Sequence, residues 1–128
     1  MSCQDFGGRW YNTMVPLLEQ ELDFVLHLGD FIYESVGDTS FQDVGGERSI
    51  RFTDEAGALR IGKRGNDYLA AASLDNYRQL HREYRTDPVL QALLERAPLV
   101  AIWDDHEFSD DCWQDHATNL NGRALEND

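Results

Sequence analysis

The alternation of apolar and polar positions divides the chain into short helices and strands. Apolar residues recur at helical spacing over Arg9–Glu21, which predicts a helix that Pro16 would kink or delay. The nearly continuous apolar run Leu22–Leu28 predicts a buried strand, and Gly29 permits a tight exit from it. The chain therefore opens with a helix followed by a strand.

The middle of the chain has no sustained period. Ser35–Asn66 is rich in glycine and scattered charges, which predicts a long surface excursion that serves as an insertion loop or lid. Loops beyond about 15 residues usually have a function or are disordered. We therefore expect this segment to shape access to a site.

The second half returns to regular spacing. Ser73 can cap a helix whose buried face is formed by Leu74, Tyr77, Leu80, His81 and Tyr84. Asp87-Pro88 places an N-cap carboxylate before a proline at the first helical position, which predicts a short helix through Leu94. Pro98 would end that helix, and Leu99–Trp103 predicts a second strand. Helices alternating with strands predict an α/β fold with parallel strand pairing.

Both predicted strands end in residues that can bind metal. The first leads into Gly29-Asp30 with Tyr33 three residues later, and the second into Asp104-Asp105-His106. In open α/β sheets, ligands bind outside the carboxyl ends of the strands, so both phrases should face one crevice. Each also has a simpler explanation: Asp30 as a turn aspartate, Tyr33 as a half-buried aromatic, and residues 104–106 as a solvated acidic loop.

These motifs resemble those of the PhoD-like alkaline phosphatases, a family of metallophosphoesterases. The family pattern runs Ser-Cys-Gln, Gly-Asp-x-Ile-Tyr-Glu and Trp-Asp-Asp-His-Glu, and this chain has all three at Ser2–Gln4, Gly29–Glu34 and Trp103–Glu107. Residues 74–78 and 84–88 also look like the family, so the resemblance covers nearly the whole chain. Three motifs in this order and spacing are far more specific than a lone Gly-Asp pair.

The resemblance implies a metal centre with Fe³⁺ and Ca²⁺. It makes Cys3 and Tyr33 ligands of iron and Asp30 the carboxylate that bridges the metals. A phenolate suits a hard, highly charged ion, because the unperturbed pKa of tyrosine is about 10. Comparison with the Gly-Asn-His-Glu segment of related binuclear phosphoesterases makes Asp105 a further ligand and His106 the catalytic side chain.

The neighbouring residues are expected to support the site rather than bind metal. Asp104 supports the ligands, and hydrogen bonding or helix capping explains Glu34 and Glu107 as well as ligation does. We expect Cys112 to be structural and His27 to be a hydrogen-bonded core histidine. Asp110-Asp111 stands where asparagine is common in the family.

The implied activity is that of a phosphoric ester hydrolase acting on monoesters or diesters. A metal-held hydroxide would attack phosphorus in line, while His106 donates a hydrogen bond or proton to the leaving oxygen. The implied fold is the N-terminal half of a metallophosphoesterase-like (calcineurin-like) sandwich, as one partial domain over residues 1–128. The later motifs that complete the family's metal shell have no counterpart here. We therefore expect a fragment with an exposed apolar edge that tends to associate, and a Cys3 that is frayed.

Composition narrows the partners. The 128 residues carry 11 basic and 24 acidic side chains and a net charge of −13, which disfavours nucleic acid and anionic membranes. Because a phosphate ester is itself an anion, bound cations would have to reverse the local field. The sequence contains neither a signal-peptide pattern nor an apolar run approaching the ~20 residues of a membrane span. A full-length family member would be expected in the periplasm or secreted.

Two other functions fit parts of the sequence. The chain could be a catalytically incomplete acidic module that binds divalent cations or a protein, and turnover of a chromogenic phosphate ester separates this from an enzyme. Thiol redox chemistry at Cys3 is disfavoured, because Cys3 and Cys112 form no Cys-x-x-Cys pair.

Overall fold

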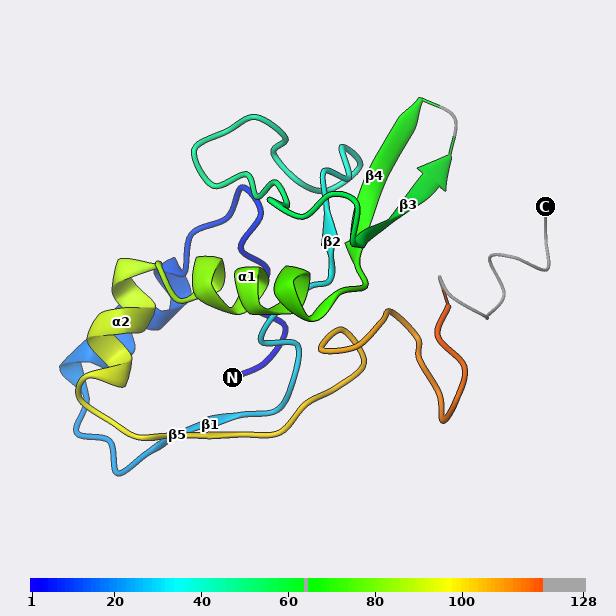
Figure 1. Ribbon diagram of the computed structural model, residues 1–128. Coiled ribbons are helices and arrows are strands. Elements are labelled where there is room, and N and C mark those ends of the chain that lie inside the picture. Colours follow the sequence, from blue (N-terminus) through cyan, green and yellow to red (C-terminus); the bar gives the residue numbers. More distant parts are fainter. Residues whose placement is uncertain (64, 119–128) are drawn as a thin grey trace.

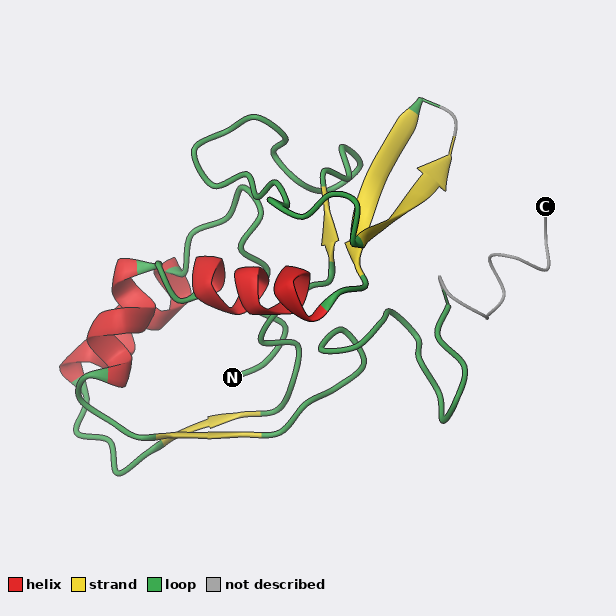
Figure 2. Cartoon of the chain, viewed as in Figure 1, coloured by secondary structure: helices red, strands yellow, loops and turns green. Residues whose placement is uncertain are grey.

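The computed structural model describes residues 1–63 and 65–118 (Figure 1). Its elements, in chain order, are the 3₁₀ helix η1 (Asn12–Glu19), the strands β1 (Val25–His27), β2 (Ser35–Val36), β3 (Ala58–Lys63) and β4 (Asn66–Ala71), the helices α1 (Leu74–Tyr84) and α2 (Pro88–Leu94), and the strand β5 (Leu99–Ala101). Helix α1 crosses the middle of the molecule, with the β1–β5 pair on one side and the β3–β4 hairpin on the other (Figures 1 and 2).

The strands form two small sheets. Strands β1 and β5 pair in parallel, with Val25 opposite Leu99 and His27 opposite Ala101, so the predicted parallel pairing is confirmed. The second sheet is antiparallel in the order β2-β4-β3. The mixed α/β class is therefore confirmed, while the calcineurin-like sandwich remains a prediction.

The two later helices begin where the sequence predicted. The Ser73 hydroxyl accepts from the Asn76 amide while the Asn76 side chain accepts from the Ser73 amide, which is a reciprocal capping box at the start of α1. Asp87 caps α2 by accepting from the amides of Val89 and Leu90, and Pro88 occupies the first turn. Local chemistry fixes both boundaries.

The first helix differs from the prediction. Instead of an α-helix over Arg9–Glu21, the structure has the shorter 3₁₀ helix η1, which packs against α2. Pro16 lies inside it and has no N–H to donate, which disfavours an α-helical ladder through this point. Met14 supplies its buried anchor.

Strand β1 is buried on one face, not on both. Val25 and His27 are buried, whereas Phe24, Leu26 and Leu28 are 46–56% exposed. The prediction of a buried strand over Leu22–Leu28 therefore holds for one face only, because alternate residues of a strand face opposite sides and the described residues cover one side. His27 is fully buried and accepts a hydrogen bond from the Gly29 amide at Nδ1, as expected of a core histidine.

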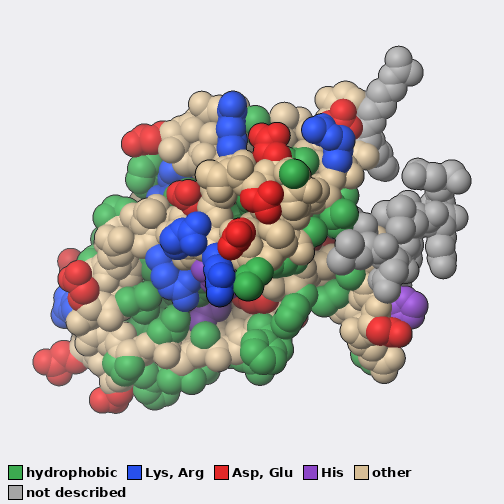
Figure 3. Space-filling view, viewed as in Figure 1, with side chains coloured by type: hydrophobic (Ala, Val, Ile, Leu, Met, Phe, Trp, Pro, Cys, Tyr) green, Lys and Arg blue, Asp and Glu red, His purple; other side chains and the backbone are tan. Residues whose placement is uncertain are grey.

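The exposed side of β1 continues onto β5 and the residues after it. Its apolar members are Leu26, Leu28, Val100, Ile102 and Trp103. In Figure 3, hydrophobic side chains gather along the lower edge, where Figure 1 shows the two strands. The expected exposed apolar surface is present, and association through it remains a prediction. Among the described helices, none is long and apolar enough to cross a membrane.

The glycine-rich excursion contains more structure than expected. It includes β2 and β3, and β3 forms a hairpin with β4. Phe52, Arg48 and Asp38 within the segment are buried. Arg48 binds Asp87 at 2.5 Å, which ties the excursion to the start of α2. The expectation that Ser35–Asn66 lacks regular structure was therefore wrong, while its role as an insertion loop or lid remains a prediction.

The amino-terminal residues run beside β1 and are not frayed. The amino group of Met1 donates to the Leu26 carbonyl at 2.7 Å, and the Leu28 amide donates to the Met1 carbonyl at 2.8 Å. The Cys3 amide then donates to the Gly29 carbonyl at 3.2 Å. These bonds hold Cys3 at the exit of β1, contrary to the expectation of fraying.

Candidate metal centre and active site

Two strand exits meet at the carboxyl end of the parallel pair. Gly29 and Asp30 both have positive φ angles, 104° and 54°, which turn the chain sharply after β1. A Cβ on Gly29 would lie 2.5 Å from the Cβ of Asp104, so glycine allows the two exits to touch. Asp30 holds a left-handed conformation that is uncommon for residues other than glycine, and such conformations concentrate at functional sites.

Glu107 joins the two exits. Its Oε2 accepts from the amides of Asp30, at 3.0 Å, and Asp104, at 2.7 Å, while its Oε1 accepts from the Phe31 amide at 2.5 Å. One carboxylate thus receives three backbone N–H donors from loops more than seventy residues apart. Glu107 is occupied in positioning both loops, in agreement with the supporting role expected for it.

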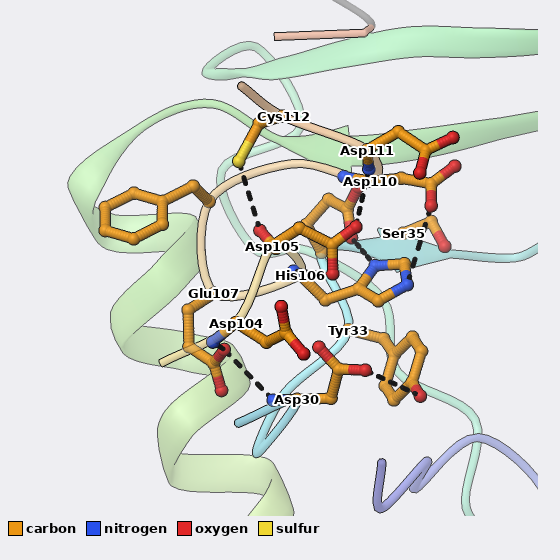
Figure 4. Close-up of polar contacts among 12 residues, drawn as sticks. Asp30, Tyr33, Ser35, Asp104, Asp105, His106, Glu107, Asp110, Asp111 and Cys112 are labelled. Carbon is orange, nitrogen blue, oxygen red and sulfur yellow. Dashed lines mark hydrogen bonds and ion pairs between the residues drawn. The ribbon is translucent and has the colours of Figure 1, made fainter. Parts of the chain in front are cut away.

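Asp30, Asp105 and His106 form a cluster in the space between the exits (Figure 4). Each offers a ligand atom, and these atoms lie within 4.8 Å of one another. Asp30 is 7% exposed, and its Oδ1 is buried without a hydrogen-bond partner among the described residues. A buried carboxylate oxygen without a donor carries a large desolvation cost. The corner of the site formed by Asp30, Asp105 and His106 therefore lacks a donor for this oxygen within the described residues.

The pKa of Asp30 reflects its burial beside other carboxylates. Burial raises the pKa of the Asp30 carboxyl above its ordinary value, and the charges of Asp105 and Asp104 raise it further. A hydrogen bond from the side chain of Cys3 and the charge of His106 act in the opposite direction. Carboxylates that repel one another in a partly buried site are stabilised by a cation.

Tyr33 and Cys3 border the cluster. The Tyr33 hydroxyl donates to Asp30 Oδ2 at 3.4 Å, and its ring lies 4.2 Å from the His106 ring between centroids. Burial, together with the negative charge of Asp30, raises the pKa of Tyr33, so the phenol is neutral without a cation beside it. Cys3 is exposed and forms no disulfide. The structure thus brings Cys3, Asp30, Tyr33 and Asp105 to one place, while their roles as ligands remain predictions.

His106 is held between two carboxylates. Its Nδ1 lies 2.7 Å from Glu34 Oε2, and its Nε2 lies 3.6 Å from Asp110 Oδ1. Burial of the ring lowers the pKa, but the hydrogen bond and charge of Glu34 outweigh it and raise the pKa to about 9. The imidazole is therefore protonated at neutral pH and fixed by the buried Glu34.

Asp105 opens a tight turn that carries the acidic end of the site. Its carbonyl accepts from the amides of Phe108 and Ser109, and its Oδ2 accepts from the Asp111 amide at 2.6 Å. Asp105, Asp110 and Asp111 also place ligand atoms within 4.8 Å of one another. Cys112 lies against the Asp105 carbonyl and forms no disulfide.

The sequence did not identify Asp110 or the pairing of Glu34 with His106. Asp110 is four residues after His106, and its amide donates to Glu34 Oε1 at 2.7 Å. The i,i+4 spacing of His106 and Asp110 was the available signal, although the segment is a turn and not a helix. Glu34 had only been expected to support the site in a general way.

Comparison with known proteins assigns the chain to a family. The family model described as PhoD-like phosphatase matches residues 1–128. The chain belongs to the PhoD-like phosphatase family. It is 30% identical over 106 residues to alkaline phosphatase D of Bacillus subtilis (strain 168), an alignment that covers 83% of this chain and 15% of that protein.

A solved structure supports the assignment to the PhoD-like family. The structure titled "Structure of PhoD" matches with a TM-score of 0.54 and 31% identity, and covers 82% of this chain and 17% of the other. The chain thus spans less than a fifth of the length of the relatives it matches. The residues that form the corner at Asp30 all lie within the part that matches the family model.

Proposed function

We propose that this chain carries part of the active site of a metal-dependent phosphoric ester hydrolase that acts on small phosphate monoesters or diesters. The observation that carries the proposal is the buried Oδ1 of Asp30, in a chain of the PhoD-like family. This oxygen has no hydrogen-bond partner in the part of the chain that the structure describes, and Asp30 clusters with Asp105 and His106. The cluster brings together the carboxylates of Asp30 and Asp105, and among the described residues they do not each have a positively charged partner. A cation completes such a set.

The donor set fits the metals that the resemblance implies. Asp30, Asp105, Tyr33 and Cys3 would hold them, with hard carboxylate and phenolate oxygens suited to Fe³⁺ or Ca²⁺ and a thiolate suited to iron. When bound, such ions supply Lewis acidity that lowers the pKa of water and offsets the charge of the phosphoryl group. The proposed metals rest on the family resemblance and on this donor set.

His106 would act on the leaving oxygen. With a pKa of about 9 it carries a proton at neutral pH, and Glu34 fixes its ring through Nδ1. A protonated imidazole beside the metal ligands can donate a hydrogen bond or a proton as the alcohol departs. Glu34 acts through His106 and is therefore a positioning residue.

A second function is a cation-binding module without turnover. The acidic group at Asp105, Asp110 and Asp111 favours this alternative. Both functions predict metal binding. Hydrolysis of para-nitrophenyl phosphate by the full-length protein separates them, since the module would show none.

Substitution of His106 and Tyr33 tests the assigned roles. In the full-length protein, His106→Ala should lower turnover by about 10²–10⁴-fold, typical of a lost general acid, and retain bound metal. Tyr33→Phe should abolish the visible absorption of a tyrosinate bound to Fe³⁺. His116→Ala, at an exposed histidine outside the corner, is the matched control. Unchanged turnover in His106→Ala, or an unchanged band in Tyr33→Phe, would refute the corresponding role.

A further inference from the structure

A cavity of about 300 Å³ adjoins the candidate active site on the side of the excursion, residues 35–66. Tyr33, Glu34 and His106 form its inner end. Its outer wall is formed by Phe41, Ile61 and Tyr68, which come from the excursion and the β3–β4 hairpin. The cavity therefore joins the imidazole to a wall that presents two aromatic side chains and one aliphatic side chain.

Hydrogen bonds hold the outer wall in place. Buried Asp38 accepts from the Ser40 hydroxyl at 2.5 Å and from the Asn66 side chain at 2.8 Å. The Thr39 hydroxyl donates to Asn66 Oδ1 at 2.6 Å, and Tyr68 makes a side-chain hydrogen bond to Asp38. These bonds connect the loop that carries Phe41 to the hairpin that carries Ile61. The wall is thus preorganised to receive a ligand.

Acidic side chains dominate the charged lining of the cavity. Its charged lining consists of Glu34, Asp38 and Asp110 together with the imidazole of His106, and among the described residues no lysine or arginine lines it. Glu34 and Asp38 are buried and accept hydrogen bonds, whereas the Asp110 side chain is 56% exposed. A ligand in this cavity meets aromatic faces and carboxylates, which favour a cation or a neutral apolar group and repel an anion.

We propose that this cavity receives the alcohol part of the phosphate ester and selects esters whose alcohol is apolar and either neutral or cationic. The inference rests on the proposed function, since it places the phosphoryl group at the Asp30 corner and the alcohol beyond His106. The position of His106 between corner and cavity requires the departing oxygen to lie next to the imidazole. A second anionic group on the alcohol would then face Asp110.

Three matched esters test the selection in the full-length protein. Phenyl phosphate and para-trimethylammoniophenyl phosphate should have kcat/KM values at least about tenfold above that of para-carboxyphenyl phosphate, because like charges oppose binding of the carboxylate.

Two lysine substitutions test whether the cavity causes this selection. Ile61→Lys adds a cation to the cavity wall and should reduce the ratio of kcat/KM for phenyl phosphate to that for para-carboxyphenyl phosphate by about fivefold or more. Asp67→Lys adds more positive charge on the opposite face of the hairpin, as the alternation of side chains along β4 requires, and should leave the ratio unchanged.

Phe41→Lys provides an independent version of the same change. Phe41 is 41% exposed, so a lysine there is compatible with folding even where Ile61→Lys is not. Equal kcat/KM values for the three esters, or a ratio that Asp67→Lys changes as much as the cavity variants do, would overturn the inference.

Binding of the free alcohols separates this inference from the proposed function. Saturation-transfer NMR with phenol, para-hydroxybenzoate and the para-trimethylammonio phenol needs no turnover. If no ester is hydrolysed, the proposed function fails, and the order of alcohol binding still decides the inference. The expected order places para-hydroxybenzoate last in the wild type and raises it in Ile61→Lys, and equal binding of all three would contradict the cavity's role.

Discussion

Asp30 and Asp87 are both buried carboxylates, yet their surroundings differ in one decisive respect. Asp87 accepts from the amides of Val89 and Leu90 and binds Arg48 at 2.5 Å, so both its oxygens have donors. Arg48 in turn lies 3.9 Å above the Phe6 ring. Asp30 accepts a 3.4 Å hydrogen bond from Tyr33 at Oδ2, and its Oδ1 has no hydrogen-bond partner among the described residues.

The comparison separates a structural carboxylate, Asp87, from Asp30, the one we propose to bind metal. A buried charge whose partners all come from the chain connects parts of the fold, here the excursion and the start of α2. A buried charge that faces other carboxylates costs stability until an ion from outside joins it. Burial alone would rank the two aspartates together, and their partners distinguish them.

The largest effect is expected at Asp87. Asp87→Ala leaves the guanidinium of Arg48 buried without a counterion and removes the cap of α2, so the free energy of unfolding should fall by about 3–5 kcal/mol. Urea denaturation followed by circular dichroism measures it. Asp75→Ala removes an exposed carboxylate that lies 3.9 Å from Arg78 and should change stability little. Equal effects in the two variants would contradict the structural role of Asp87.

The second effect concerns pH in the metal-free protein. Because Glu34 raises the pKa of His106 to about 9 in the fold, above the ordinary 6.5, the protonated imidazole stabilises the fold. That stabilisation is complete below about pH 6.5 and is lost as pH rises through about 9, a loss on the order of 2 kcal/mol. Denaturation curves from pH 6 to 10 should show the decline, and Glu34→Gln should flatten it. A profile of Glu34→Gln parallel to the wild type would assign the decline to other groups.

A smaller effect is expected at Glu107. This residue lies in the Asp30 corner but resembles Asp87, since both its oxygens accept backbone donors. Glu107→Gln keeps the size and turns one acceptor into a donor, so we expect a loss of about 1–3 kcal/mol in unfolding free energy. Metal affinity should fall as well, because the two exits lose their shared acceptor. Glu55→Gln, at a surface position, is the control, and unchanged stability and affinity in Glu107→Gln would refute the positioning role.

The sequence was most informative where chemistry is local. Ser73 and Asp87-Pro88 predicted the starts of α1 and α2, because a capping side chain acts within three residues of itself. The meeting of Asp30 with Asp105 also followed from sequence, since parallel strands bring their carboxyl ends to one edge.

Long-range contacts account for what was missed. Arg48 looks like a loop charge in the sequence, and its burial depends on Asp87, thirty-nine residues later. The β3–β4 hairpin was obscured by glycines, although Leu59 and Ile61 alternate with polar positions before the Gly65 turn. Cys3 is held by a hydrogen bond from its amide to the Gly29 carbonyl that no local pattern indicates. Pairing across the chain, not propensity, decides these elements.

The most direct test compares wild type and Asp30→Asn for stabilisation by metal. Without metal, Asp30→Asn should be at least as stable as the wild type, because it removes a charge that faces Asp105 and Asp104. With Ca²⁺, or with Fe³⁺ as a weak chelate, at about 100 times the dissociation constant, the wild type should gain roughly 2.7 kcal/mol in unfolding free energy and Asp30→Asn should gain little. A wild type that neither ion stabilises, or an Asp30→Asn variant that gains as much as the wild type, would contradict a metal centre at Asp30.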